Sequence, residues 1–137
     1  MASVLVERYK THFTKGNFNN HIGVPLTLLA MPKDTEIAII EMGANHIGDI
    51  KELCDIAEPN FGIITNIGKA HLEGFGSLEG VAKAKSELYY HVLKNGDKHF
   101  VNSTDEHLDR LYKRFENPIK FPQKDDFATV SFIAANP

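Results

Sequence analysis

The chain has 137 residues, of which 42% are hydrophobic and 24% charged, the size and composition of one ordinary globular domain. Its formal net charge of -3 and pI near 6.1 argue against a non-specific nucleic-acid binder, which usually carries an excess of basic residues. No apolar run approaches the ~18 residues of a membrane span, and the N-terminus lacks the apolar core of a secretory signal. A cytoplasmic protein is therefore expected.

Helical and strand patterns alternate along the chain. The predicted elements are, in chain order, helix 2–10, helix 25–31, strand 37–40, helix 49–57, strand 61–65, helix 78–93, strand 99–101, helix 105–115, and weaker strand candidates at 119–121 and 129–133. The run at 37–40 is short, unbroken and rich in β-branched residues, as expected of a strand covered on both faces, and 61–65 is of the same type. This alternation predicts βαβ units, and therefore an α/β fold with a mostly parallel sheet and flanking helices.

The helix 49–57 carries two local signals. Asp49 is predicted to cap it, with Glu52 three residues later completing a capping-box pattern. Cys54 is the only cysteine, so no internal disulfide is possible, and we interpret it as a small core residue in a reducing compartment.

At the ends, the chain opens in a predicted helix without a cap and stops after a strand candidate, so both ends are expected to be truncations.

Two strand ends carry residues suited to chemistry. In open parallel sheets, ligands bind beyond the carboxyl ends of the strands. Glu41 directly follows the strand 37–40, where a carboxylate needs a cation or donors to offset its desolvation; a solvated strand end is the alternative. His71 follows the strand 61–65 in a glycine-containing loop, although most loop histidines are surface residues. The two side chains could converge on one metal ion, and ligand chemistry alone would favour zinc or manganese over magnesium.

The helix 78–93 contains two lysines with different surroundings. One apolar stripe at helical spacing is formed by Leu78, Val81, Ala82, Leu88, Tyr89 and Val92. Lys85 falls within this stripe, whereas Lys83 lies four residues from both Glu79 and Glu87, as is typical of surface ion pairs. A lysine on a buried face either extends its amine to solvent or becomes a neutral, reactive amine because desolvation lowers its pKa. The pattern marks Lys85 as the candidate functional lysine.

Four segments in combination resemble the Mur ligase family. They are residues 16–25 (GNFNNHIGVP), 41–45 (EMGAN), 70–77 (AHLEGFGS) and 81–87 (VAKAKSE). The resemblance covers about residues 1–110 and is strongest to the branch that adds D-alanyl-D-alanine to UDP-N-acetylmuramoyl-tripeptide in peptidoglycan biosynthesis. It implies that residues 1–137 are part of a P-loop NTPase-like central domain that binds ATP.

The resemblance also implies a mechanism, an ATP-dependent ligation through an acyl phosphate. ATP and Mg²⁺ would be the cofactors, and UDP-N-acetylmuramoyl-tripeptide and D-alanyl-D-alanine the substrates. Carried over by motif, Glu41 and His71 would hold one magnesium ion. Lys85, carbamylated by carbon dioxide, would hold another, and Asn19 and Asn20 would lie near the substrate.

The sequence departs from the family pattern in several places. The Gly-Lys-Ser/Thr ending of a phosphate-binding loop is absent from the 137 residues, as is the His-Asn segment that contacts adenine in the family. The family's amino-terminal and carboxy-terminal domains are also missing. These residues alone are therefore expected to be inactive, although the complete protein would be an enzyme.

Two alternatives remain open. A sibling amide ligase, such as another Mur ligase or folylpolyglutamate synthase, would share the metal-binding residues but differ around 17–25 and 74–77. A non-catalytic binding module of the same ancestry would lack a phosphate-binding loop in its complete gene as well. The oligomeric state cannot be inferred from the sequence.

Overall fold

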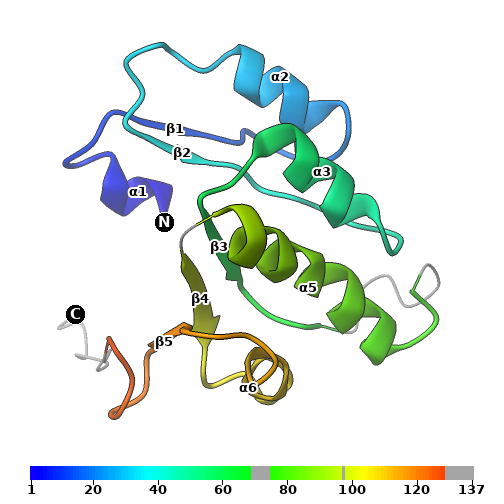
Figure 1. The fold of residues 1–137 in the computed structure, drawn as a ribbon. Helices are drawn as coiled ribbons and strands as arrows, with labels where there is room; N and C mark the ends of the chain where they lie inside the picture. The colour runs from blue at the N-terminus through cyan, green and yellow to red at the C-terminus, as the bar shows by residue number, and fades with distance from the viewer. Residues whose placement is uncertain (69–74, 97, 129–137) are drawn as a thin grey trace, which may run out of the picture.

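A computed structural model describes residues 1–68, 75–96 and 98–128 (Figure 1). Its elements are, in chain order, α1 (Ala2–Leu5), β1 (Thr11–Phe13), α2 (Gly23–Leu29), β2 (Ile37–Ile39), α3 (Asp49–Ala57), β3 (Phe61–Ile64), α5 (Leu78–Asn95), β4 (Lys98–Asn102), α6 (Glu106–Tyr112) and β5 (Ile119–Phe121). Strands and helices alternate as predicted, which confirms the α/β fold. The strand candidate at 129–133 lies outside the described residues.

All described strand pairs are parallel, but they form two sheets where one was expected. β1 pairs with β2 in the smaller sheet, and the larger sheet has the order β3-β4-β5. Parallel strands need crossover connections, and helices supply them here. α2, α3 and α5 follow one another down Figure 1, and α3 packs against both neighbours. Helix packing therefore joins the two sheets.

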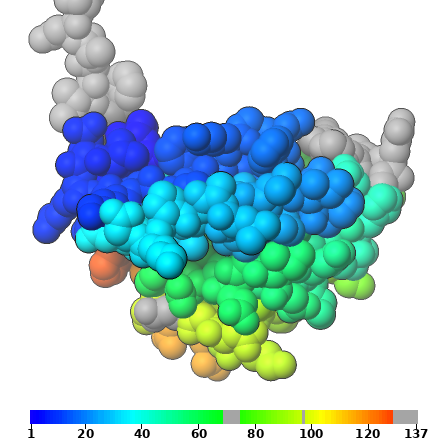
Figure 2. Space-filling view, turned by 90° about the horizontal axis from the view of Figure 1, so that it is seen from above, coloured from blue at the N-terminus to red at the C-terminus, as the bar shows by residue number. Residues whose placement is uncertain are grey.

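The N-terminal third departs most from the sequence prediction. The helix expected over 2–10 ends at Leu5, and residues 11–13 form β1, which was not predicted. This strand has only three residues and includes Thr11 and His12, so it shows neither an apolar run nor a clear alternation. Seen from above, the blue and cyan segments of this third make up most of the visible face (Figure 2).

The strand predicted at 37–40 forms as β2, but its burial differs from the expectation. Ala38 is exposed, and Ile37 and Ile39 are only half-buried. The reason is the small sheet, in which β2 has β1 as its ladder neighbour and limited cover. In β3, by contrast, Gly62 and Ile64 are buried, because this strand lies under α5.

The main core lies between α5, the larger sheet and α6. Its buried members are Ile64, Ile67, Val81, Tyr89, Val101, Leu108, Leu111 and Phe115. Burial of each large apolar side chain contributes about 1.5–3 kcal/mol. Tyr89 is fully buried, and its hydroxyl donates to the Phe100 carbonyl at 2.8 Å, so its polar atom is satisfied. The amphipathic pattern of 78–93 therefore places α5 as predicted.

Cys54 packs as the small core residue that the sequence suggested. It is fully buried, and its thiol donates weakly to the Met42 sulfur at 3.8 Å. Burial raises the pKa of the thiol to about 12, so the reactive thiolate is suppressed.

Among the residues that the structure describes, no helix has the length and hydropathy needed to cross a bilayer.

Candidate functional site

Glu41 lies at the carboxyl end of β2, where it meets the segment that follows β1. Its backbone N–H donates to Thr14 Oγ1 at 2.9 Å, and its Oε1 accepts a hydrogen bond from Asn19 Nδ2 at 2.8 Å. The Gly43 N–H donates to the Asn19 carbonyl at 2.7 Å. A Cβ on Gly43 would lie 3.0 Å from the Asn19 side chain, so this approach suits glycine. The predicted metal ligand and the predicted substrate residue are thus in contact.

The Glu41 carboxylate meets the elementary requirement for a metal ligand. It is exposed, and Asn19 Nδ2 donates to one of its oxygens, which fixes its orientation. A carboxylate oxygen is a ligand that magnesium prefers. The side chain is therefore oriented and open to a cation.

Asn20 has a role within the fold. Its Oδ1 accepts hydrogen bonds from the backbone N–H groups of Ile22 at 3.1 Å and Gly23 at 2.9 Å, and so satisfies two donors at the start of α2. Gly23 is buried, and a Cβ there would lie 2.3 Å from the Phe18 Cα. Asn20 therefore shapes the turn of the 16–25 segment, and its contact with substrate stays a prediction.

The turn between Glu41 and α3 is held by Asp49, in a way that differs from the predicted cap. Gly48, with a φ of 103°, is the N-cap, and Asp49 is the first helical residue. The Asp49 Oδ2 accepts from the backbone N–H groups of Asn45 at 2.8 Å and His46 at 2.9 Å. The hydrogen bond from Asn45, with that from His46, lowers the pKa of Asp49. The predicted capping box is wrong.

Glu87 of α5 supplies the carboxylate that the capping box would have provided. Its Oε1 accepts from the Gly48 N–H at 2.8 Å, and its Oε2 accepts from the Lys51 N–H at 2.9 Å. Both donors belong to the first turn of α3, whose N–H groups have no partner within the helix. The Glu87 carboxylate therefore faces α3, and within the described ranges it forms no ion pair with Lys83.

Lys85 points to the carboxyl end of β3. Its Nζ donates to the Asn66 carbonyl at 2.8 Å, and the side chain is half-buried. Burial lowers the pKa of the Lys85 ammonium, and the nearby Asp105 carboxylate opposes this shift. Lys83 is exposed on the same helix. The Lys85 amine therefore reaches the residues that follow β3, and its role as a ligand stays a prediction.

Asp105 is a residue of this region that the motif reading did not single out. Its Oδ1 accepts from the N–H groups of His107 at 2.9 Å and Leu108 at 3.1 Å, which caps α6. Its Oδ2 accepts from the Ile67 N–H at 3.2 Å, in the loop after β3. An aspartate at the start of a predicted helix signals a cap, but its long-range contact carries no local signal.

His71 lies outside the described residues, so its predicted approach to Glu41 stays a prediction. Within the ranges that the structure describes, no group of three or more His, Cys, Asp or Glu side chains is arranged to hold a metal ion. That set does not include His71 or a modified Lys85. Glu41 and Lys85 are the two predicted ligands that the structure describes, each at the carboxyl end of a strand.

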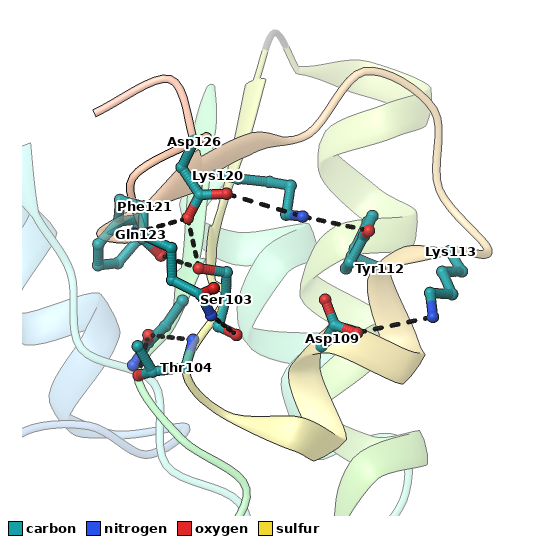
Figure 3. A network of polar contacts seen from close by, with 10 residues as sticks. Ser103, Thr104, Asp109, Tyr112, Lys113, Lys120, Phe121, Gln123 and Asp126 are labelled. Atoms are coloured by element: carbon teal, nitrogen blue, oxygen red, sulfur yellow. Dashed lines mark hydrogen bonds and ion pairs between the residues drawn. The ribbon is translucent and has the colours of Figure 1, made fainter. Parts of the chain in front are cut away.

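A further polar network joins the ends of β4 and β5 (Figure 3). Ser103 is buried, and its hydroxyl donates to the Phe121 carbonyl at 3.0 Å and to the Asp126 carboxylate. Gln123 Nε2 donates to the Ser103 carbonyl at 2.7 Å, and the Gln123 N–H donates to Asp126 at 2.9 Å. Lys120 Nζ lies 3.7 Å from Asp126. These contacts satisfy buried polar groups and fix the turn after β5.

Comparison with known proteins places these features in a family. The model of the Mur ligase middle domain matches residues 1–134. UDP-N-acetylmuramoyl-tripeptide–D-alanyl-D-alanine ligase of Haemophilus influenzae is 50% identical over 105 residues, which are 77% of this chain and 23% of the relative. The enzyme of the same name from Bacillus subtilis is 50% identical over 94 residues, 69% of this chain and 21% of the relative. The chain thus spans less than a quarter of these relatives.

Solved structures agree with the sequence relatives. MurF from Acinetobacter baumannii superposes with a TM-score of 0.79 at 36% identity, over 90% of this chain and 27% of that one. MurF ligase from Thermotoga maritima, solved in complex with ADP, superposes with a TM-score of 0.74 at 32% identity, over 89% of this chain and 28% of that one. The chain therefore belongs to the Mur ligase family, and residues 1–134 correspond to its middle domain.

Proposed function

We propose that this chain is the ATP-handling part of a cytoplasmic ligase that joins D-alanyl-D-alanine to UDP-N-acetylmuramoyl-tripeptide in peptidoglycan biosynthesis. The names of the relatives at 50% identity support this reaction, and the ADP complex of the Thermotoga maritima neighbour supports nucleotide binding. The observation that carries the proposal is the half-buried Lys85 amine, directed at the carboxyl end of β3 with its pKa lowered.

The reaction transfers the terminal phosphoryl group of ATP to the carboxylate of the tripeptide, which releases ADP and forms an acyl phosphate. The amine of D-alanyl-D-alanine then attacks the acyl carbon. The amide bond forms, the bond from carbon to the phosphate oxygen breaks, phosphate leaves, and the amine loses a proton. The enzyme contributes by holding the three reactants in line and by stabilising the charge that moves between them.

Lys85 is proposed to act as a carbamate. The ammonium first loses a proton, the neutral amine attacks carbon dioxide, a carbon–nitrogen bond forms and a second proton leaves, so that a cation becomes a carboxylate-like anion. Only the neutral amine reacts, and partial burial favours that form because it lowers the pKa of Lys85. The Asn66 carbonyl accepts a hydrogen bond from the unmodified amine and holds the side chain in this direction.

Glu41, His71 and the modified Lys85 are proposed to hold magnesium ions, with Glu41 and His71 sharing one. Bound magnesium would neutralise charge on the phosphate groups of ATP and of the acyl phosphate. Asn19 orients the Glu41 carboxylate through its side-chain amide, and its backbone carbonyl accepts the N–H of Gly43, two residues after Glu41. Asn19 and Asn20 are proposed to lie next to the substrate.

Phosphate release by the complete ligase that contains this segment tests the proposal. We expect release to require ATP, UDP-N-acetylmuramoyl-tripeptide and D-alanyl-D-alanine together, and the product to gain the mass of the dipeptide. A preference for a single amino acid or for glutamate in place of the dipeptide would assign the chain to a sibling ligase. No ligation with any amine would favour the non-catalytic binding module.

A further inference from the structure

Glu87 connects the two predicted ligand-bearing parts of the chain. It lies on α5, two residues after Lys85, and its carboxylate accepts the Gly48 and Lys51 N–H groups at 2.8 and 2.9 Å. The sequence separations are 39 and 36 residues, so these bonds fix one helix against another. Each is a charge-assisted bond to a helix N-terminus, where a negative charge is favoured.

The start of α3 in turn fixes the loop that begins at Glu41. Asp49, next to Gly48, accepts the N–H groups of Asn45 and His46. Further along α3, Cys54 holds Met42 through the 3.8 Å contact between the two sulfur atoms. The loop is therefore attached to α3 in its middle and next to Glu41. A shift of α3 relative to α5 would move Glu41 relative to Lys85.

We infer that Glu87 is a positioning residue, which sets the placement of Glu41 relative to Lys85 by fixing α3 against α5. It does not contact the reacting groups itself. For the activity, the inference rests on the proposed function, because it concerns the same two ligands. For the structure it stands alone, since the linkage from Glu87 to the Glu41 loop is a property of the described residues.

The structural test compares amide NMR spectra of the 137-residue chain and two variants. Glu87→Gln keeps the size of the side chain but removes its charge and one acceptor. Glu52→Gln removes an exposed charge from α3 and serves as the matched control. We expect Glu87→Gln to shift the Gly43 amide and the Asn19 side-chain amide and to speed the exchange of the Gly43 hydrogen. Glu52→Gln should leave both signals in place.

A change confined to Gly48 and Lys51 in Glu87→Gln would overturn the inference, because the disturbance would then end at the capped turn. If Glu87→Gln unfolds the chain, Glu87→Asp, which keeps the charge and shortens the reach, provides the same comparison of Gly43 with Gly48. These outcomes do not depend on ligase activity. Failure of the proposed function therefore leaves this arm of the test intact.

The kinetic test measures kcat and KM of the complete ligase, with each peptide substrate varied in turn while the other substrates are saturating. We expect Glu87→Gln to lower kcat by about tenfold to a hundredfold, because small displacements of catalytic groups have effects of that size. The KM values for both peptide substrates should stay within about twofold, since Glu87 is proposed to act on the transition state through ligand placement and not on ground-state binding. A kcat equal to that of Glu52→Gln, with wild-type ligation intact, would contradict the positioning role.

Discussion

Lys83 and Lys85 differ in what surrounds their amines, although they lie two positions apart on α5. Lys83 is exposed, while the Lys85 amine reaches the Asn66 carbonyl from a half-buried position. Desolvation of the charged ammonium outweighs the opposing effect of the nearby Asp105 carboxylate. The pKa of Lys85 is lowered for that reason. Its chemistry therefore follows from its position on the helix.

Lys85→Ala should lower kcat of the complete ligase by about a hundredfold or more, because it removes a group that we propose stabilises charge in the transition state. Lys83→Ala, the matched control, should change stability by less than about 0.5 kcal/mol and leave kcat near the wild-type value. Steady-state phosphate release measures kcat for both variants, and urea unfolding measures the stability of Lys83→Ala. Acetate should partly restore Lys85→Ala, whereas added bicarbonate should not. Equal losses in the two variants would contradict the assignment.

His99 predicts a dependence of stability on pH. Its ring is 1% exposed, packs between Tyr89 and Phe115 at centroid distances of 4.9 and 5.8 Å, and leaves Nε2 without a partner among the described residues. Burial lowers the pKa of His99 below 6.5. Between the folded and unfolded pKa values, the unfolded chain binds the proton and the folded chain does not. Stability is therefore lost as the pH falls below about 6.5.

Urea unfolding at a series of pH values measures this loss. The contribution of one histidine has a slope of at most about 1.4 kcal/mol per pH unit. His99→Phe keeps an aromatic ring next to Tyr89 and Phe115 but cannot bind a proton. We therefore expect its free energy of unfolding to fall less between pH 7 and pH 5 than that of the wild type. An identical pH profile for wild type and His99→Phe would refute the prediction.

The N-termini of the helices are capped by two kinds of acceptor, local side chains and a side chain of another helix. Ser77 is the N-cap of α5, with its Oγ accepting the Gly80 N–H at 3.1 Å, and Asp105 is the N-cap of α6. Both caps are local and follow the ordinary preference for short polar side chains. The start of α3 is different, because its acceptor is Glu87 on another helix. A local cap fixes only the residue at which a helix starts, whereas Glu87 also fixes the position of α3 against α5.

Asp105→Ala should destabilise the chain by about 1–2 kcal/mol, because it removes the cap of α6 and the acceptor of the Ile67 N–H. Glu106→Gln, an exposed change one residue later, should cost less than about 0.5 kcal/mol. The free energy of unfolding from urea titration measures both. A loss of the same size in the two variants would show that Asp105 makes no special contribution.

The sequence predicted the elements that depend on interactions between residues close together in the chain, and it missed features that depend on distant residues. Long periodic or apolar segments, such as 78–93 and 61–65, formed the expected elements because their patterns are local. β1 was missed because three mixed residues carry no pattern. The direction of Lys85 agreed with its place in the apolar stripe. The hydrogen-bond partners of Glu41 and Glu87 could not be predicted from local sequence patterns, since they lie 22 or more residues away along the chain.

The whole chain lacks the Gly-Lys-Ser/Thr sequence that places a lysine and backbone N–H groups around ATP phosphates. We therefore expect the 137-residue chain to bind Mg-ATP weakly and to show no ATPase or ligase activity. Calorimetric titration with Mg-ATP and a phosphate-release assay measure these two properties. Micromolar binding would contradict this prediction and would require another source of phosphate contacts within the chain.

The division into two sheets has a consequence for local unfolding. In the described part of the chain, no backbone ladder connects β1-β2 to β3-β4-β5, and the main core belongs to the larger sheet. The amides of the smaller sheet should therefore open, and exchange with deuterium, at a lower free energy than those of β3 and β4. Native-state hydrogen exchange would resolve the two as separate cooperative units. Glu41 follows the sheet that we expect to open more readily, and Lys85 lies against the other sheet, so these two predicted ligands should leave their folded positions at different free energies.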